Sequence, residues 1–315
     1  MFNERQSISS KGRKQEFPAI KIDNVVIVLT GKILKTASIF DEVWLDCNFV
    51  DTNKIIEVIQ ESKNKPDIFT FCQLDFKKPR FHFTSEIINI AAIPISNYDH
   101  WWTKQINSKE RNMIRKAQKN GVDVRLADFD EKLIEGIEKI NNETPVRQGK
   151  PFWHYHKCVE HIKESHSSYL ARSEFIGAYS NEELIGYIKI VYMAGVAGIM
   201  QIISTIKDRD KAPNNALIAK AVEICAKREV KYLIYGEYDY GKKEHNSLLD
   251  FKKKNGFIKI EYPRYYVPLT LKGKFAIQFG LHKGFMKMMP VWLITTMTKL
   301  RSDYYNFVKI KFKDH

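Results

Sequence analysis

Cysteine is scarce in this sequence and widely spread. The 315-residue chain has four cysteines and no CxxC pair, so neither a zinc ribbon nor a disulfide-bonded scaffold is indicated, and a reducing compartment is expected. The amino terminus is polar and charged where a secretory signal would be apolar. Because no apolar run reaches the roughly 18 residues that a spanning helix needs, the sequence predicts a cytoplasmic protein.

Several common nucleotide and hydrolase motifs are also missing. The sequence has neither GxxxxGK(S/T) nor GxGxxG, and it has no GxSxG nucleophile turn. Acidic residues are outnumbered, since 51 Lys and Arg against 37 Asp and Glu give a formal charge of +14. This balance indicates a polyanionic partner, either nucleic acid, an anionic membrane surface or a phosphorylated cofactor; a Lys-rich solvated surface is an equal alternative.

Length and composition are those of a globular protein with two domains. Hydrophobic residues make up 44% of the chain and charged residues 28%. Residues 1–17 are polar and predict a mobile leader. Between residues 18 and 106, β-like segments such as Val25–Leu29 and Ile87–Ile95 and one helix, Asn53–Lys63, predict a small α/β domain without a chemical motif.

The most informative stretch is Gly198–Gly236. It predicts an apolar strand over Ile199–Ile206, a polar loop, a helix with an apolar stripe, and a strand over Tyr232–Tyr235. A loop that enters a helix presents unpaired backbone N–H groups at the positive end of the helix dipole, which suits an anionic ligand. Pro213 fits the first helical turn, and Asn214 fits a cap or a left-handed turn. An ordinary α/β crossover is the alternative.

A second segment, Ser108–Arg125, predicts a basic helix. Ser108 fits an N-cap and Asn120-Gly121 fits a helix stop, and nearly all the charges between them are positive. We expect this helix either to face an acidic ligand or surface or to be an ordinary solvated helix.

Beyond this helix the predicted elements follow a definite order. They are a strand at Val122–Leu126, helices at Glu131–Asn141 and Phe152–Glu164, strands at Ser168–Arg172, Phe175–Tyr179, Leu184–Met193 and Ala197–Ile206, the loop, helix and strand described above, a helix at Asn246–Asn255, and strands at Phe257–Glu261 and Tyr265–Leu269. Over Val122–Leu269 this order resembles the GNAT acyltransferase fold. The segment SLLDFKKKNGF, Ser247–Phe257, resembles that family's last helix and its exit into a strand.

The segment RNMIRKAQKNGVDV, Arg111–Val124, resembles the corresponding entry of the Fem-type peptidoglycan-bridge aminoacyltransferases, which carry two GNAT-like domains in tandem. The resemblance implies a mixed α/β fold with a largely antiparallel sheet flanked by helices. It also implies a degenerate GNAT-like domain at 18–106, an acyltransferase domain at 107–270 and a basic amphipathic tail at 271–315.

The GNAT resemblance implies a donor site at the polar loop. GNAT enzymes hold the diphosphate of acetyl-CoA on a (Q/R)xxGx(G/A) loop, and the best register here is Lys211–Ala216, with Lys for Gln/Arg and Asn for Gly. Asn is the commonest substitute for Gly at positive φ. Fem-type enzymes lack a clear loop and use aminoacyl-tRNA, so the expected donor is acyl-CoA or aminoacyl-tRNA. The residues predicted to bind it are Ile203, Ser204, Lys211, Asn214, Asn215, Ala216 and Asn246.

The resemblance also implies a Tyr near the final helix that protonates the leaving group. Tyr240 is the predicted acid, with Asp239 or Glu237 as the base, beyond a strand end where α/β sites form; a solvated loop is the alternative. A polar and aromatic loop is predicted to bind the acceptor through Arg147, Gln148, Lys150, Trp153, His154 and Tyr155. No metal is expected, because His154 lacks partner ligands at suitable spacing.

The segment 271–315 is basic with apolar clusters, which predicts either a helix packed on the domain or one lying on an anionic membrane surface. The hypothesis from the whole sequence is an acyl- or aminoacyl-transferase that acts by direct attack of an amine or hydroxyl of a sugar or cell-envelope precursor. The alternative is a non-catalytic GNAT-like module that binds RNA or an anionic membrane.

Overall fold

The chain folds into two compact units. The computed structural model describes residues 2, 4–10, 13–45, 51–62, 65–73, 79–239 and 247–283. Unit 1 comprises the described residues of Met1–Asn89 and Glu261–Ile294, and unit 2 those of Ile90–Ile260. Strands β6 (Thr84–Pro94) and β14 (Ile258–Pro268) each have residues in both units.

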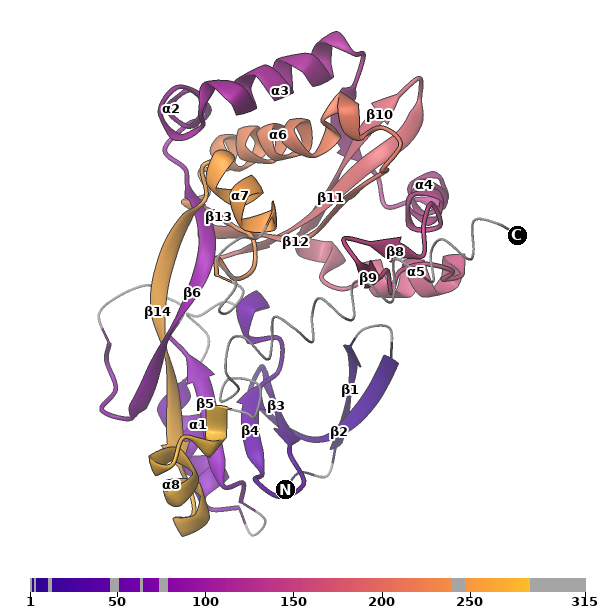
Figure 1. Ribbon diagram of the computed structural model, residues 1–315. Coiled ribbons are helices and arrows are strands. Elements are labelled where there is room, and N and C mark those ends of the chain that lie inside the picture. The colour runs from indigo at the N-terminus through magenta and orange to yellow at the C-terminus, as the bar shows by residue number, and fades with distance from the viewer. Residues whose placement is uncertain are drawn as a thin grey trace. The chain divides into compact units, whose positions relative to one another are not determined.

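Unit 1 is built on a mixed sheet (Figure 1). Strands β1 to β4 follow one another as antiparallel neighbours, β5 runs parallel to β4, and β14 is antiparallel to β5. The elements are β1 (Glu4–Ser10), β2 (Arg13–Ile22), β3 (Val25–Thr30), β4 (Thr36–Ile39), η1 (Glu42–Trp44), α1 (Thr52–Gln60), β5 (Ile68–Cys72), α8 (Leu271–Gln278) and η6 (Leu281–Lys283). Ile55, Ile56 and Ile59 of α1 are buried, as their helical spacing predicts.

The amino-terminal residues form strands where the sequence predicts a mobile leader. β1 pairs with β2 over its whole length, and β2 in turn pairs with β3. The sequence of β1, ERQSISS, has no apolar alternation, so its place in the sheet depends on backbone hydrogen bonds. Ala19 and Ile22 of β2 provide buried apolar contact. A polar strand of this kind leaves no periodic signal in the sequence.

Unit 2 holds the predicted meander in the middle of its sheet. The strand order is β6-β13-β12-β11-β10-β7, with β13 parallel to β12 and the other neighbours antiparallel. The elements are α2 (Tyr98–His100), η3 (Trp101–Gln105), α3 (Ser108–Lys119), β7 (Asp123–Ala127), α4 (Glu131–Asn141), β8 (Val146–Arg147), β9 (Lys150–Pro151), α5 (Val159–His166), η4 (Leu170–Arg172), β10 (Ser173–Ser180), β11 (Glu183–Met193), β12 (Val196–Ser204), η5 (Arg209–Lys211), α6 (Pro213–Lys227), β13 (Tyr232–Ile234) and α7 (Ser247–Lys254). The order of meander, loop, helix and strand is confirmed.

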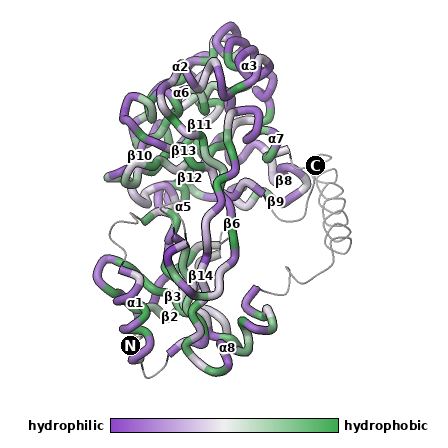
Figure 2. Tube along the Cα trace, turned by 90° about the vertical axis from the view of Figure 1, so that its left-hand side faces the viewer, coloured by the Kyte–Doolittle hydropathy of each residue, from purple (hydrophilic) through white to green (hydrophobic). Residues whose placement is uncertain are grey.

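Helices cover both faces of the unit 2 sheet. α6 packs on β10, β11 and β12 and also contacts α3, whereas α4 contacts β11 and α5 (Figure 1). Successive residues of β11 serve the two sides: Ile188 belongs to the core with Leu217 of α6, and Tyr187 to the core with Ile137 of α4. Figure 2 shows hydrophobic residues running through these strands in green. The central strand is therefore buried on both faces.

Three predicted segments differ from the structure. The helix predicted over Phe152–Glu164 is confined to α5, because residues 152–157 form turns that follow the β8–β9 hairpin. Residues 170–172 form the turn η4, where a strand is predicted. The two strands predicted after α7 are the single strand β14, in which Pro263 interrupts hydrogen bonding without ending the strand.

The buried side chain of Trp101 contributes both packing and a hydrogen bond to the core of unit 2. Its side chain is fully buried and its Nε1 donates to the Asn255 carbonyl oxygen at 3.0 Å. We expect Trp101→Leu to lower the free energy of unfolding by about 3 kcal/mol, because packing is lost and a buried carbonyl loses its donor. Urea denaturation measures this change. The control Trp153→Leu, at a site 50% exposed, should change it by about 0.5 kcal/mol at most; equal losses would contradict the assignment.

Candidate functional site

The strands β12 and β13 of unit 2 diverge after a short parallel pairing. They pair only from Val196–Tyr232 to Gly198–Ile234, whereas β12 continues to Ser204 in register with β11. β13 instead stays with β6, since the chain after it exchanges backbone hydrogen bonds with Ala91. Residues 199–204 of β12 therefore have an open edge, without a ladder partner among the described residues.

Backbone groups of β12 point alternately to β11 and to the open edge. The N–H of Thr205 donates to the Ile185 carbonyl oxygen of β11 at 2.9 Å, which fixes the phase of the alternation. The N–H groups of Ile202 and Ser204 consequently face the open edge. Predicted site residues Ile203 and Ser204 thus lie on the strand with the open edge, although it is the N–H groups of Ile202 and Ser204 that face outward.

The loop after β12 offers two more backbone donors, and a carboxylate of the chain binds both. Oxygens of Glu143, just after α4, accept from the N–H of Ile206 at 2.6 and 2.8 Å and from the N–H of Lys207 at 2.8 Å. The amides of Ile206 and Lys207 are therefore occupied by a carboxylate of the chain itself, whereas the loop residues predicted to bind an anionic donor are Lys211–Ala216. Sequence reasoning missed Glu143, since a contact about 60 residues away has no local pattern; its spacing of four from Arg147 is the one available signal.

Arg147, a predicted acceptor-binding residue, has a structural role. Its guanidinium donates to the Ser204 and Ile140 carbonyl oxygens, both at 2.8 Å, and to Glu143 at 3.2 Å. Its charge also lies over the Phe152 ring, 4.4 Å from the centroid. Burial lowers the pKa of Arg147, and the Glu143 carboxylate acts in the opposite direction. Arg147 therefore joins α4, β12 and the hairpin loop.

Lys211, predicted to contact the donor, is paired within the loop. Its Nζ lies 2.9 Å from Asp208 Oδ1 and donates to Ser180 Oγ at 3.0 Å. Asp208 also accepts from the Thr205 hydroxyl at 2.8 Å. Burial raises the pKa of Asp208, but the hydrogen bonds from Lys211 and Thr205 outweigh it and hold the pKa below its ordinary value. The lysine therefore neutralises a carboxylate of its own loop.

Helix α6 begins without a side-chain cap. Pro213 is its first residue, as predicted, and Ala212 before it takes the left-handed conformation with φ of 55°. Asn214 and Asn215 lie inside the first turn, so the prediction that Asn214 caps the helix or takes the left-handed turn is wrong. The polar Asn214 Oδ1 is buried and makes no hydrogen bond to the described residues. Ala216 follows in the same turn, and the predicted donor residue Asn246 lies outside the described residues.

The remaining predicted acceptor residues lie on and after the β8–β9 hairpin. Gln148, with φ of 53°, forms its tip, and Lys150 is exposed. Trp153 is half exposed and stacks on His154 with ring centroids 4.0 Å apart. His154 Nε2 lies 3.2 Å from Gln201 Nε2 of β12, and Tyr155 follows the stack. The hairpin loop therefore reaches the same strand that has the open edge.

The predicted catalytic residues follow β13. Glu237 is exposed, and Asp239 pairs with Lys259 at 3.1 Å; Tyr240 lies outside the described residues. A residue that sequence reasoning missed is Lys252 of α7, which is fully buried and donates from Nζ to the Glu237 carbonyl oxygen at 2.6 Å. Burial lowers its pKa to about 8. Its spacing of four from Leu248 indicates the inward face of the helix.

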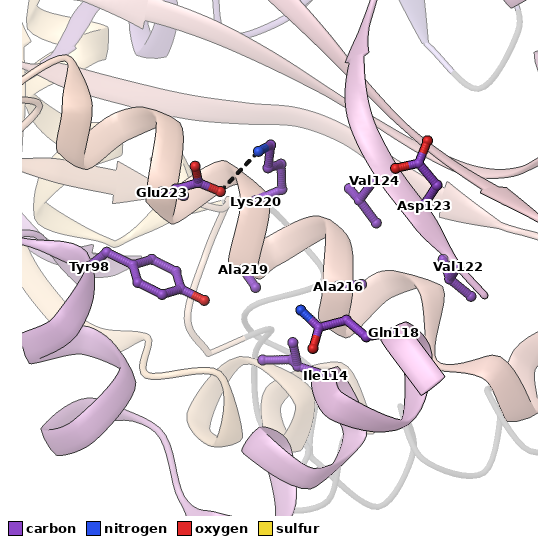
Figure 3. Close-up of a pocket in the computed structure, with 10 residues that line it drawn as sticks. All are labelled: Tyr98, Ile114, Gln118, Val122, Asp123, Val124, Ala216, Ala219, Lys220 and Glu223. Atoms are coloured by element: carbon purple, nitrogen blue, oxygen red, sulfur yellow. Dashed lines mark hydrogen bonds and ion pairs between the residues drawn. The ribbon is translucent and has the colours of Figure 1, made fainter. Parts of the chain in front are cut away.

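A separate pocket of about 270 Å³ lies between α3, α6 and β7 (Figure 3). Tyr98 and Gln118 contribute polar groups to it, and its charged groups are paired, Lys220 with Glu223 at 3.0 Å and Asp123 with Arg125. Of the predicted site residues, it includes Ala216. The pocket therefore does not gather the residues of the open edge.

Metal-ion clusters and membrane-spanning helices are not found in the described part of the chain. The part of the chain that the structure describes contains no group of three or more His, Cys, Asp or Glu side chains placed to hold a metal ion. In that same part, no helix is both long and apolar enough to cross a bilayer.

Comparison with known proteins gives matches only in structure. No protein-family model matches the chain, and no curated protein matches it in sequence. The crystal structure of FemX matches with a TM-score of 0.54 at 13% identity, over 82% of this chain and 87% of FemX. The C-terminal domain of a putative lysylphosphatidylglycerol synthetase from Agrobacterium fabrum matches with a TM-score of 0.54 at 10% identity, over 88% of each chain. These matches confirm the Fem-like fold expected from the sequence, and they are matches of fold alone.

His154 makes a pH-dependent contribution to stability. Burial, and then the charges of His166 and Arg147, lower its pKa from 6.5 to about 4. Because the unfolded chain binds this proton more readily, stability is lost as pH falls from about 6.5 to about 4. We expect His154→Gln to reduce the pH-dependent loss of unfolding free energy in this window by about 2 kcal/mol, allowing for partial exposure. Urea denaturation at pH 7 and pH 4.5 measures the loss of unfolding free energy between the two pH values. An equal loss in the wild type and in His154→Gln would contradict this role for His154.

Proposed function

We propose that the chain is an acyl- or aminoacyl-transferase whose donor lies along the open edge of β12. The observation that supports this most directly is the pair of outward N–H groups at Ile202 and Ser204. They are about 7 Å apart along the strand, so one can bind the reacting carbonyl oxygen and the other a second polar group of the donor. A fixed backbone donor stabilises the negative charge that develops on that oxygen during attack.

The proposed reaction is a direct transfer. An amine or hydroxyl attacks the donor carbonyl carbon, a new C–N or C–O bond forms, and the ester C–O or thioester C–S bond breaks. The proton lost by the attacking group ends on the leaving oxygen or sulfur. We propose Glu237, Asp239 and Tyr240 for this proton path; of the two carboxylates, Asp239 is already paired with Lys259. The amine of Lys252 lies against the same strand end.

For the donor, the acidic surroundings of the loop support an aminoacyl ester over acyl-CoA. Glu143 fills the amides of Ile206 and Lys207, and Lys211 is held by Asp208. A diphosphate here would meet carboxylates in place of free donors. An aminoacyl-tRNA ester carries no diphosphate, and the exposed lysines of α3, among them Lys116, suit an RNA backbone.

Acyl-CoA is the second candidate, and one observation favours it. The first turn of α6 has no side-chain cap, so the N–H groups of Asn214 and Asn215 and the positive end of a 15-residue helix are available to a phosphate. This is the position that GNAT enzymes use for the diphosphate of CoA.

For the acceptor, we propose a sugar or a cell-envelope precursor that carries an amine or hydroxyl. The half-exposed Trp153 stacked on His154 provides an aromatic surface on which a sugar ring can lie. One similar structure is named as a domain of a putative lysylphosphatidylglycerol synthetase. The product in that name is a lipid that carries a lysyl group. The alternative, a non-catalytic module that binds RNA or membrane, predicts binding without transfer.

Proline substitution tests the open edge directly. Ile202→Pro and Ser204→Pro each remove one outward N–H and leave the hydrogen bonds to β11 intact, since Pro is tolerated at a strand edge. We expect the variant that loses the oxyanion donor to transfer about 100-fold to 1,000-fold more slowly. The measurement is single-turnover loss of the acyl group from aminoacyl-tRNA and from acetyl-CoA, with a panel of amino sugars and amine-bearing envelope precursors.

The control for this test is Ile203→Pro, whose N–H points to β11. It should unfold at clearly lower temperature, whereas the two edge variants should not. If the wild-type protein transfers from neither donor, the enzyme hypothesis fails and the binding module remains. Wild-type rates in both edge variants would show that transfer does not use this edge.

Glu143→Gln tests the choice of donor. The substitution keeps the shape of the side chain and removes the negative charge that a CoA diphosphate would meet. We expect CoA to bind the variant about tenfold more tightly than the wild type, since a unit charge a few ångströms away is worth on the order of 1 kcal/mol or more near a protein surface. Isothermal titration calorimetry measures the affinity, with Glu135→Gln on the exposed side of α4 as the control. Tight CoA binding by the wild type, unchanged in the variant, would favour acyl-CoA.

A further inference from the structure

The helix α8 of unit 1 presents a stripe of large apolar side chains to solvent. Leu271 is 78% exposed, Phe275 58%, Phe279 66%, and Leu281 of the following turn 56%. Among the described residues eleven large apolar side chains are at least 39% exposed, and four of them fall within the eleven positions 271–281. Such a concentration marks an interaction surface, because single exposed apolar residues are ordinary but clusters are not.

The opposite face of α8 is fixed to unit 1, so the outward direction of the stripe is set by packing. Gly273 lies so close to the Asp67 carbonyl that a Cβ at this position would collide with it. Ala276 is buried in a cluster with Ile68 and Tyr266. The Thr270 hydroxyl caps the helix by accepting from the Gly273 N–H at 3.0 Å. The residues of the stripe therefore cannot turn inward without undocking the helix.

Lysines flank the stripe on both sides. At 100° per residue, Leu271, Phe275 and Phe279 span one narrow face, with Lys272 at one border and Lys274 at the other. Lys272 has 55% of its side chain exposed and Lys283 46%. The carboxylates that meet them, Asp67 and Glu86, are only 11% and 16% exposed. The surface seen from outside is thus apolar in the middle and positive at its rim.

We propose that α8 and η6 form a docking surface for an anionic lipid bilayer. The apolar side chains enter the boundary between headgroups and acyl chains, and the lysines contact phosphate groups, as in helices that lie in a membrane interface. The net charge of +14 adds long-range attraction to such a surface. The docking does not depend on the proposed transfer reaction.

Flotation with lipid vesicles tests the docking surface on the full-length protein. We expect binding to vesicles of phosphatidylcholine mixed with phosphatidylglycerol, weakening as salt rises, and little binding to phosphatidylcholine alone. The double variant Phe275→Ser/Phe279→Ser should bind about tenfold more weakly or worse, since two rings no longer enter the interface. Lys274→Glu should weaken binding more than the control Lys116→Glu on α3. No binding to anionic vesicles at low salt would overturn the proposal.

Two other possible occupants of the stripe, residues 284–315 of this chain and a second copy of the protein, are distinguished from a bilayer by further measurements. The control double variant Leu126→Ser/Ile258→Ser removes two apolar residues elsewhere that are about half exposed, 54% and 49%, and it should leave vesicle binding unchanged. If residues 284–315 cover the stripe, Phe275→Ser/Phe279→Ser will lower the unfolding temperature by several degrees, which would overturn the proposal. If a second copy covers it, sedimentation without lipid will show a dimer that the same variant abolishes, with the same consequence. A monomer of unchanged stability that loses vesicle binding supports it.

Discussion

The geometry of unit 2 depends on the brevity of one parallel pairing. β13 has three residues and then continues alongside β6, because the chain after it hydrogen-bonds to Ala91. β12 instead remains paired with β11 as far as Ser204. Their separation opens the edge of β12, and Lys252 of α7 hydrogen-bonds to the chain just beyond the end of β13. The backbone thus supplies the donors of the candidate site, which explains how such a site can exist without a diagnostic side-chain motif.

The charges around the open edge are largely neutralised by the chain itself. Glu143 accepts hydrogen bonds from the two amides after β12, and Lys211 forms an ion pair with Asp208. Arg147 donates to carbonyl oxygens of α4 and β12. The uncapped first turn of α6 adds the positive end of a helix dipole to this loop. At the candidate site a carboxylate of the chain thus lies next to an uncapped helix start, so the electrostatic potential differs between these neighbouring positions.

Sequence patterns predicted those parts of the structure that depend on local periodicity. The apolar stripe of α6, the meander, and Pro213 at the start of the helix follow from residues a few positions apart. The polar strand β1 could not be predicted, because its partner is a backbone. Nor could Glu143, which binds amides about 60 residues away. At the start of α6 the chemistry of Asn suggested the left-handed turn, yet Ala212 takes it, since Ala212 is the single residue between the end of η5 and the first residue of α6.

Arg147 links the two halves of the candidate site. Its guanidinium holds the Ser204 carbonyl at the end of the open edge, and its own backbone belongs to the hairpin that leads to the Trp153–His154 stack. Because the planar guanidinium donates to Ser204, Ile140 and Glu143 together, it cannot shift toward one of these partners without weakening its hydrogen bonds to the others. Its Nε is buried and makes no hydrogen bond to the described residues. A displacement of the hairpin would therefore also disturb the hydrogen bond from Arg147 to the Ser204 carbonyl oxygen at the end of β12.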